Sequence, residues 1–103
     1  MADPMRIRAV ARDGVVNVKV LMSHEMETGQ RKDGAGQLVP AHFIQSVSAT
    51  HNGKVVLSAQ WGPAVSKNPF LEFNFKAGQK GERISVTWTD NKGEQRTDEA
   101  TIN

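Results

Sequence analysis

The feature that most constrains this chain is a period-two alternation of apolar and polar residues, interrupted by residues that favour tight turns. Between Val16 and Met22 an apolar side chain stands at every second position. Successive side chains of a β-strand point to opposite faces, so this pattern predicts strands with one face buried. Asp13-Gly14 and Asn52-Gly53 predict two-residue hairpin turns, because both central positions of such a turn need a positive φ. The chain is therefore expected to form antiparallel sheets.

About seven short strands are predicted by this pattern, and no segment predicts a long helix. The predicted strands lie at residues 6–12, 16–22, 43–50, 55–61, 71–76, 84–89 and 94–102. Strands of this length joined by tight turns are typical of a two-sheet sandwich. We therefore predict an all-β fold, an immunoglobulin-like β-sandwich of about seven antiparallel strands, as a single domain over residues 1–103.

The alternation also predicts which side chains are buried. Trp88 lies in the middle of an alternating strand and is expected in the core. The weakly apolar segment 94–102 suits an edge strand. Trp61 and Phe70 flank a loop, and two interpretations stay open for each of them, namely packing in the core and partial exposure. The strand after the Asn52-Gly53 turn is expected to point four side chains inward: Val55, Leu57, Ala59 and Trp61.

Residues 23–42 form the longest break in the alternation. A connection of this length is uncommon in a small domain unless it is functional or forms its own ribbon. The Asp33–Gly36 cluster favours a turn, so Met26–Lys32 is expected to pair with Gln37–Pro40. A sandwich does not need such a ribbon, which makes it a candidate binding element.

A second break runs from Trp61 to Phe70 and holds two prolines. Pro63 and Pro69 cannot donate a backbone hydrogen bond, so this segment cannot continue a central strand. Aromatic residues on a rigid loop are typical anchors of protein interfaces. This loop is therefore the second candidate binding element.

Composition excludes several classes of function. The 103 residues contain no cysteine, which excludes disulfides, thiolate metal sites, thiol nucleophiles and blue-copper centres in this chain. The net charge of +2 gives no strong indication of nucleic-acid binding. No apolar run approaches the roughly 18 residues that a membrane-spanning helix needs, so we expect neither nucleic acid nor membrane as a partner.

Enzymatic signatures are lacking as well. No Gly-x-Ser-x-Gly motif occurs, and the acidic pairs are interpreted as solvated surface, so we expect no catalytic residue and no enzyme activity. Gly34-Ala35-Gly36 lacks the Lys-Ser/Thr that completes a phosphate-binding loop. The basic stripe of Arg6, Arg8 and Arg12 is interpreted as protection of an edge strand against aggregation.

One metal hypothesis stays open. Met22, His24 and Met26 could hold Cu(I), because thioether and imidazole are soft ligands. The favoured interpretation is that these are loop and edge residues with no metal or cofactor bound. A periplasmic copper-handling β-sandwich protein is kept as the alternative function.

Four segments together resemble the SoxZ family, a subunit of the sulfur-carrier pair of the Sox thiosulfate-oxidation system. They are Val18–Lys32, Val39–Ile44, Trp61–Phe70 and Trp88–Thr101. The string Ser-His-Glu-Met-Glu-Thr-Gly-Gln-Arg-Lys-Asp at residues 23–33 is the most specific part. The resemblance covers essentially the whole chain.

The resemblance implies a non-catalytic subunit that forms a heterodimer with a SoxY-type subunit. In the family, the SoxY subunit carries sulfur intermediates on a cysteine in a flexible Gly-Gly-Cys-Gly-Gly arm and presents them to other Sox enzymes. The present chain ends in Thr101-Ile102-Asn103 and has no cysteine, so it cannot be the carrying subunit. The resemblance also implies a periplasmic location, with export on the partner's signal because no leader is visible here. Without its partner, the chain could form a homodimer.

Partner contacts are expected in the ribbon and in the proline loop. The assignment rests on loop length, aromatic content and the family strings. The predicted partner-binding residues are Met26, Glu27, Thr28, Gly29, Arg31, Lys32, His42, Phe43, Trp61, Pro63, Val65, Ser66, Asn68 and Pro69.

Overall fold

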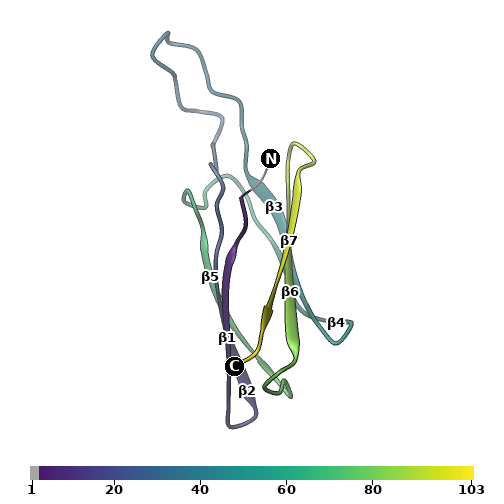
Figure 1. Ribbon diagram of the computed structural model, residues 1–103. Coiled ribbons are helices and arrows are strands. Elements are labelled where there is room, and N and C mark those ends of the chain that lie inside the picture. The colour runs from purple at the N-terminus through teal and green to yellow at the C-terminus, as the bar shows by residue number, and fades with distance from the viewer. Residues whose placement is uncertain (1–2) are drawn as a thin grey trace.

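The computed structural model describes residues 3–103 as two antiparallel β-sheets packed face to face (Figure 1). The strands are β1 (Arg6–Arg12), β2 (Val15–Leu21), β3 (Ile44–His51), β4 (Lys54–Gln60), β5 (Phe70–Lys76), β6 (Arg83–Asp90) and β7 (Gln95–Thr101). One sheet has the order β1-β2-β5 and the other has the order β4-β3-β6-β7. The predicted seven-stranded, immunoglobulin-like sandwich is confirmed.

No helix within residues 3–103 is long and apolar enough to cross a membrane.

The core lies between the inner faces of the two sheets, and the inner strands β2, β3 and β6 contribute most of its buried residues. Val16, Val18 and Val20 of β2 are fully buried, as the alternation predicts. Trp88 of β6 is 1% exposed, which confirms its predicted place in the core. Burying one such apolar side chain contributes about 1.5–3 kcal/mol, so these positions dominate the stability of the fold.

The two predicted hairpin turns are confirmed by their backbone angles. Asp13 and Gly14 have φ values of 54° and 80°, and Asn52 and Gly53 have values of 51° and 77°. Both central residues are left-handed in each turn, and this geometry matches the twist of the flanking strands. β1 therefore pairs with β2, and β3 with β4, in antiparallel hairpins.

A bulge in β4 overturns one predicted inward position. The register between β3 and β4 shifts after the pair Ala49–Leu57, so that Val55 lies opposite Thr50. One extra residue in a strand moves the neighbouring side chains to the other face. Val55 is consequently 64% exposed, whereas Leu57 and Ala59 keep their inward orientation.

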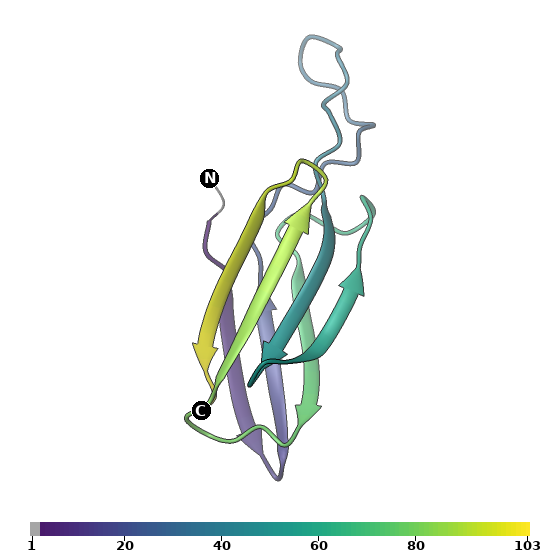
Figure 2. The same cartoon turned by 90° about the vertical axis from the view of Figure 1, so that its right-hand side faces the viewer.

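The two lateral sides of the sandwich differ. On one side, the C-terminal residues connect the sheets, since the Asn103 N–H donates to Ala9 O at 2.9 Å and its carbonyl accepts from the Ala11 N–H at 2.8 Å. On the other side, β4 and β5 are the free edges of their sheets (Figure 2). Partly buried apolar side chains line this open side; they are Leu57, Ala59, Trp61, Leu71 and Phe73.

Candidate functional site

The ribbon between β2 and β3 extends well beyond the sheets and gives the molecule its elongated outline (Figures 1 and 2). The principal extents are 53, 21 and 20 Å. Its two legs are joined by antiparallel bridges from Glu27 to His42 and from Lys32 to Leu38. The predicted pairing of Met26–Lys32 with the returning leg is confirmed at Leu38, and it extends beyond the predicted Gln37–Pro40 to His42.

Asp33 organises the tip of the ribbon. Its Oδ1 accepts hydrogen bonds from the backbone N–H groups of Ala35, at 2.9 Å, and Gln37, at 3.0 Å. The Asp33 N–H also donates to Gln37 O at 2.8 Å. An aspartate that binds its own turn in this way is a common turn former. The tip is therefore a defined turn within the ribbon.

The legs of the ribbon approach each other closely at Gly29. Gly29 has a φ of +86°, and a Cβ at this position would lie 3.1 Å from Ala41 Cβ. Glycine is favoured because it has no Cβ and adopts a positive φ without strain. The family string therefore holds a glycine at a position where the backbone requires one.

A charged pair also connects two residues of the first leg that are four positions apart, Glu27 and Arg31. The Arg31 Nε–H donates to Glu27 Oε1 at 2.9 Å. This hydrogen bond lowers the pKa of Glu27 and raises that of Arg31. An exposed pair of this kind adds little stability, so the ribbon does not depend on it.

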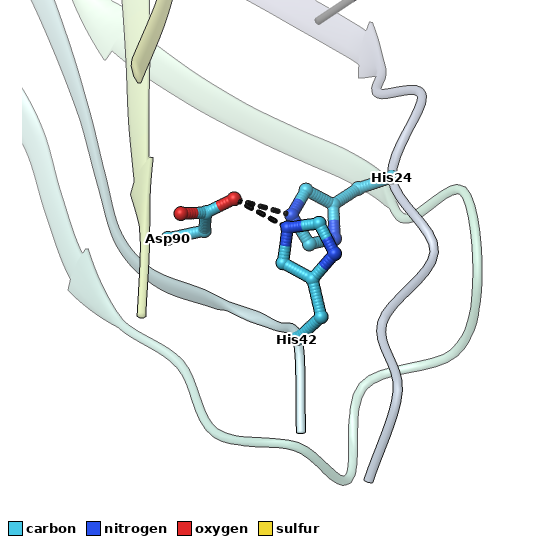
Figure 3. Close-up of side chains that lie close together, drawn as sticks. All are labelled: His24, His42 and Asp90. Atoms are coloured by element: carbon cyan, nitrogen blue, oxygen red, sulfur yellow. Dashed lines mark hydrogen bonds and ion pairs between the residues drawn. The ribbon is translucent and has the colours of Figure 1, made fainter. Parts of the chain in front are cut away.

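His24, His42 and Asp90 meet at the base of the ribbon (Figure 3). Asp90 Oδ2 lies 3.1 Å from His24 Nε2 and 2.8 Å from His42 Nε2. The two histidines belong to the two legs, whereas Asp90 is the last residue of β6. Asp90 therefore connects both legs of the ribbon to the four-stranded sheet.

The second carboxylate oxygen of Asp90 has backbone partners. Its Oδ1 accepts hydrogen bonds from the N–H groups of Lys92, at 3.0 Å, and Glu94, at 2.9 Å. Burial raises the pKa of Asp90, but the hydrogen bonds from His24, His42 and these backbone groups outweigh it and hold the pKa below its usual value. Asp90 is thus an ionised carboxylate at the centre of a hydrogen-bonded clamp.

The same three residues offer one ligand atom each within 4.8 Å of one another, which is close enough to hold a metal ion. The hydrogen bonds of His24 argue against this role. Its Nδ1 accepts the Met26 N–H at 3.1 Å, so its ring proton lies on Nε2 and points to Asp90. A metal at Nε2 would need that position deprotonated. The donor set therefore fits a hydrogen-bonded clamp better than a metal site.

The proline loop lies against the start of the ribbon. The Asn68 N–H donates to His24 O at 2.9 Å, and Asn68 Oδ1 accepts the His24 N–H at 3.0 Å. The Met22 N–H donates to Pro69 O at 2.9 Å. The two elements predicted to bind partners therefore lie at one end of the sandwich.

Most of the predicted partner-binding residues are at least partly exposed, which partner binding requires. Two are buried, Met26 and Pro69. Met26 is 5% exposed, and its Sδ accepts the Ile44 N–H at 3.4 Å. These two residues support the base of the ribbon and do not offer a surface to a partner. Asp90 was missed, although the alternation of Ile84, Val86 and Trp88 already places it inward.

The family model described as sulphur oxidation protein SoxZ matches residues 5–101. The chain belongs to the SoxZ family. This membership supports a subunit role in sulfur oxidation and fits a protein that is not an enzyme. Among curated proteins, no significant match to the chain is found.

Solved structures show the same fold at low sequence identity. A hypothetical protein of Pyrococcus horikoshii is similar with a TM-score of 0.64 and 17% identity, over 99% of this chain and 89% of the other. An Archaeoglobus fulgidus superoxide reductase variant (neelaredoxin) is similar with a TM-score of 0.63 and 21% identity, over 97% and 86%. At these sequence identities the structural similarity shows that the SoxZ chain shares the fold of these proteins, and it says nothing about activity.

The copper alternative finds no support in these relatives or in the local geometry. Met22 is 1% exposed and belongs to the core of this SoxZ domain. Both nitrogens of His24 and the sulfur of Met26 already have hydrogen-bond partners. The three residues therefore serve the packing of the ribbon base.

Proposed function

We propose that this chain is the non-catalytic subunit of a heterodimeric sulfur carrier in thiosulfate oxidation. It binds and stabilises a SoxY-type subunit and helps to present that subunit's cysteine arm to the enzymes of the cycle. The observation that carries the proposal is the family match over residues 5–101. The chain supplies no cysteine of its own, so the sulfur must be carried by the partner.

The open side of the sandwich is where we place the main contact. Leu57 of β4 and Phe73 of β5 point inward but remain partly exposed, whereas the inward-pointing valines of the central strand β2 are fully buried. Trp61 continues this apolar seam into the proline loop. Free strand edges beside apolar side chains favour association with another β-protein. A partner that covers the seam would complete the core.

The ribbon supplies the second proposed contact. Thr28, Arg31 and Lys32 are exposed on its first leg, and Asp90 fixes the direction of both legs. A ribbon held in place at its base loses little conformational entropy on binding. It can therefore contact the carrier subunit, or the enzymes that visit it, from a fixed position.

A periplasmic location is part of the same proposal. It rests on family membership together with the proposed export of a preformed pair. Expression of the two chains in one host, followed by fractionation, tests it. The chain is expected in the periplasm when it is expressed together with the partner.

Co-expression with the cysteine-bearing subunit from the same source tests the heterodimer. Size-exclusion chromatography with light scattering is expected to show a one-to-one complex that persists on dilution. Separate elution at all concentrations would contradict the proposal. A complex containing only copies of this chain would indicate a homodimer and contradict the heterodimer.

Two variants on the same strand locate the contact. Leu57→Ser removes an apolar side chain from the seam, whereas Val55→Ser removes one that points away from it. We expect Leu57→Ser to weaken the complex about tenfold or more and Val55→Ser to change it less than about twofold. Thermal unfolding of each isolated variant checks that the fold is kept. Equal losses for both variants would place the partner elsewhere.

A further inference from the structure

We propose that the outer face of the β1-β2-β5 sheet is a docking surface for a protein that presents an acidic surface. This face carries five exposed cations, which we call the basic face: Arg6, Arg8, Arg12, Lys19 and Lys76. Within the part of the chain that the structure describes, the acidic residues on this sheet face or around its cavity are Glu72 and Asp13. Its charge is therefore strongly unbalanced, whereas the whole chain carries only +2.

The cations of the basic face are not used by the fold. Among residues 3–103, no ion pair or side-chain hydrogen bond involves Arg6, Arg8, Arg12 or Lys19. Glu72 accepts a hydrogen bond from Asn17 Nδ2 at 2.9 Å and forms no ion pair with its cross-strand neighbour Lys19. The basic face thus keeps its charge available to a partner.

Arg8 and Lys19 lie directly opposite each other in the β1–β2 register. Like charges at opposed positions of an antiparallel pair repel and destabilise the sheet. The chain places this pair on two strands that the core already determines through Ala9 and Val18. The sheet gains nothing from Arg8 at this position, because Lys19 already faces the opposite charge of Glu72 on β5.

Protection of an edge strand does not account for these cations. The outward backbone groups of β1 at Ala9 and Ala11 are already bonded to Asn103. Lys19 belongs to β2, which is the central strand of its sheet. Protection of an edge strand against aggregation therefore does not explain most of the cations of the basic face.

The size and composition of the basic face favour a protein partner. From Arg6 to Arg12 it extends about 20 Å along the strand, which is too long for a single small anion. A cavity of about 570 Å³ on this face is lined by both cations and apolar side chains, including Arg8, Lys19, Val10 and Val15. Arginine mixed with apolar side chains is typical of protein interfaces. Nucleic acid would instead be held mainly through phosphate contacts.

This inference goes beyond the proposed carrier role, because the basic face lies on the outside of the sheet and not on the open seam. It therefore can be tested without the cysteine-bearing subunit. The probe is poly-L-glutamate, which presents carboxylates on a polypeptide. A mixed-sequence DNA duplex and sodium sulfate serve as competing anions.

Titration of the ¹⁵N-labelled chain with poly-L-glutamate is expected to shift amide signals of β1, β2 and β5. The affinity is expected to fall as salt is raised, because exposed charges are screened. Shifts confined to other strands would overturn the proposal. Tighter binding of the DNA duplex at the same residues would assign the face to nucleic acid and overturn it as well. Binding of sulfate at the same affinity would show that the basic face is a site for small anions and would overturn the proposal of a protein partner.

Two triple variants remove equal charge from different places. Arg8→Gln, Arg12→Gln and Lys19→Gln neutralise the basic face, while the control Lys54→Gln, Arg83→Gln and Lys92→Gln neutralises exposed cations elsewhere. We expect the first set to weaken poly-L-glutamate binding about tenfold and the control about twofold at most. Thermal unfolding of both sets checks that the fold is kept. Equal losses of affinity in both sets would show that only net charge matters.

Discussion

At the scale of single residues, Asp90 shows how a buried charge can organise a surface element. Its carboxylate accepts from His24 and His42 on one oxygen and from two backbone N–H groups on the other. A buried carboxylate is stable only when its acceptor sites are filled in this way. These hydrogen bonds offset the cost of burying Asp90, and those from His24 and His42 also hold both legs of the ribbon in place.

The sequence could indicate Asp90 but not its partners. Its place two residues after Trp88 in an alternating strand puts it on the inner face. His24 and His42 are separated from it by 66 and 48 positions, and only the packing of the ribbon base brings them together. No local pattern encodes such a contact, because it depends on the direction in which the ribbon leaves the sandwich.

Carboxylate pKa values predict sensitivity to acid. The pKa of Asp90 is lowered, and hydrogen bonds from Asn52, Gln79 and His51 lower that of Glu82 to about 2. A carboxyl with a depressed pKa in the folded state contributes stability above its unfolded pKa and loses it as the pH falls. We therefore expect the free energy of unfolding to decrease progressively from about pH 5 towards pH 2.

Urea unfolding at a series of pH values measures this slope. Glu82→Gln should flatten the slope, because the substituted residue no longer titrates. Glu99→Gln is the control, since Glu99 is exposed and its carboxylate lies on the surface of the edge strand β7. Stability that stays constant down to pH 3, or equal slopes for Glu82→Gln and the unsubstituted chain, would show that Glu82 contributes nothing.

At the scale of elements, the two interruptions of the alternation could be predicted, but the bulges could not. The length of residues 23–42 and the turn residues at 33–36 already indicated a ribbon. Val55 shows the opposite case, because a bulge inserts one residue without any distinctive sequence signal and reverses the face of the residues beside it. The same holds between Ile44 and Ser46 in the β3–β6 register, where a shift leaves Ile44 buried and opposite Asp90.

The ribbon gives a prediction about glycine. Gly29→Ala should destabilise the pairing of the two legs, because alanine is strained at a φ of +86° and its Cβ would crowd Ala41. A cost of about 1–2 kcal/mol is expected for such a positive-φ position. Hydrogen exchange should become faster at the His42 N–H, which donates to Glu27 O.

Gly34→Ala is the matched control, since a Cβ at Gly34 would meet nothing within 4 Å and its φ lies outside the left-handed region. Exchange at His42 should be unchanged in this variant. If the two alanine variants behave alike, the close approach at Gly29 does not determine the pairing of the legs.

At the scale of the whole molecule, the sandwich is closed on one lateral side and open on the other. Seven alternating strands with tight turns are enough to predict two packed sheets. The alternation cannot show which edges end up covered, because that depends on where the C-terminal residues and the loops lie in space. The open β4–β5 side became visible only in the folded structure. The arginine stripe of β1 was evident from the sequence, but its extension to Lys19 and Lys76 depends on the order of strands in the sheet.

Ile102 provides the final prediction, since it joins the two sheets at the closed side. It is 1% exposed, it forms a parallel bridge with Ala9, and its N–H donates to Glu82 O at 2.7 Å. Ile102→Ala should lower the free energy of unfolding by about 2–5 kcal/mol, the usual cost of emptying a packed site. Asn103→Ala keeps the backbone hydrogen bonds to Ala9 and Ala11 and should change the free energy of unfolding by less than about 0.5 kcal/mol. Urea denaturation compares the two variants, and light scattering should show more self-association for Ile102→Ala than for Asn103→Ala, because loosening this side frees the edge of β1.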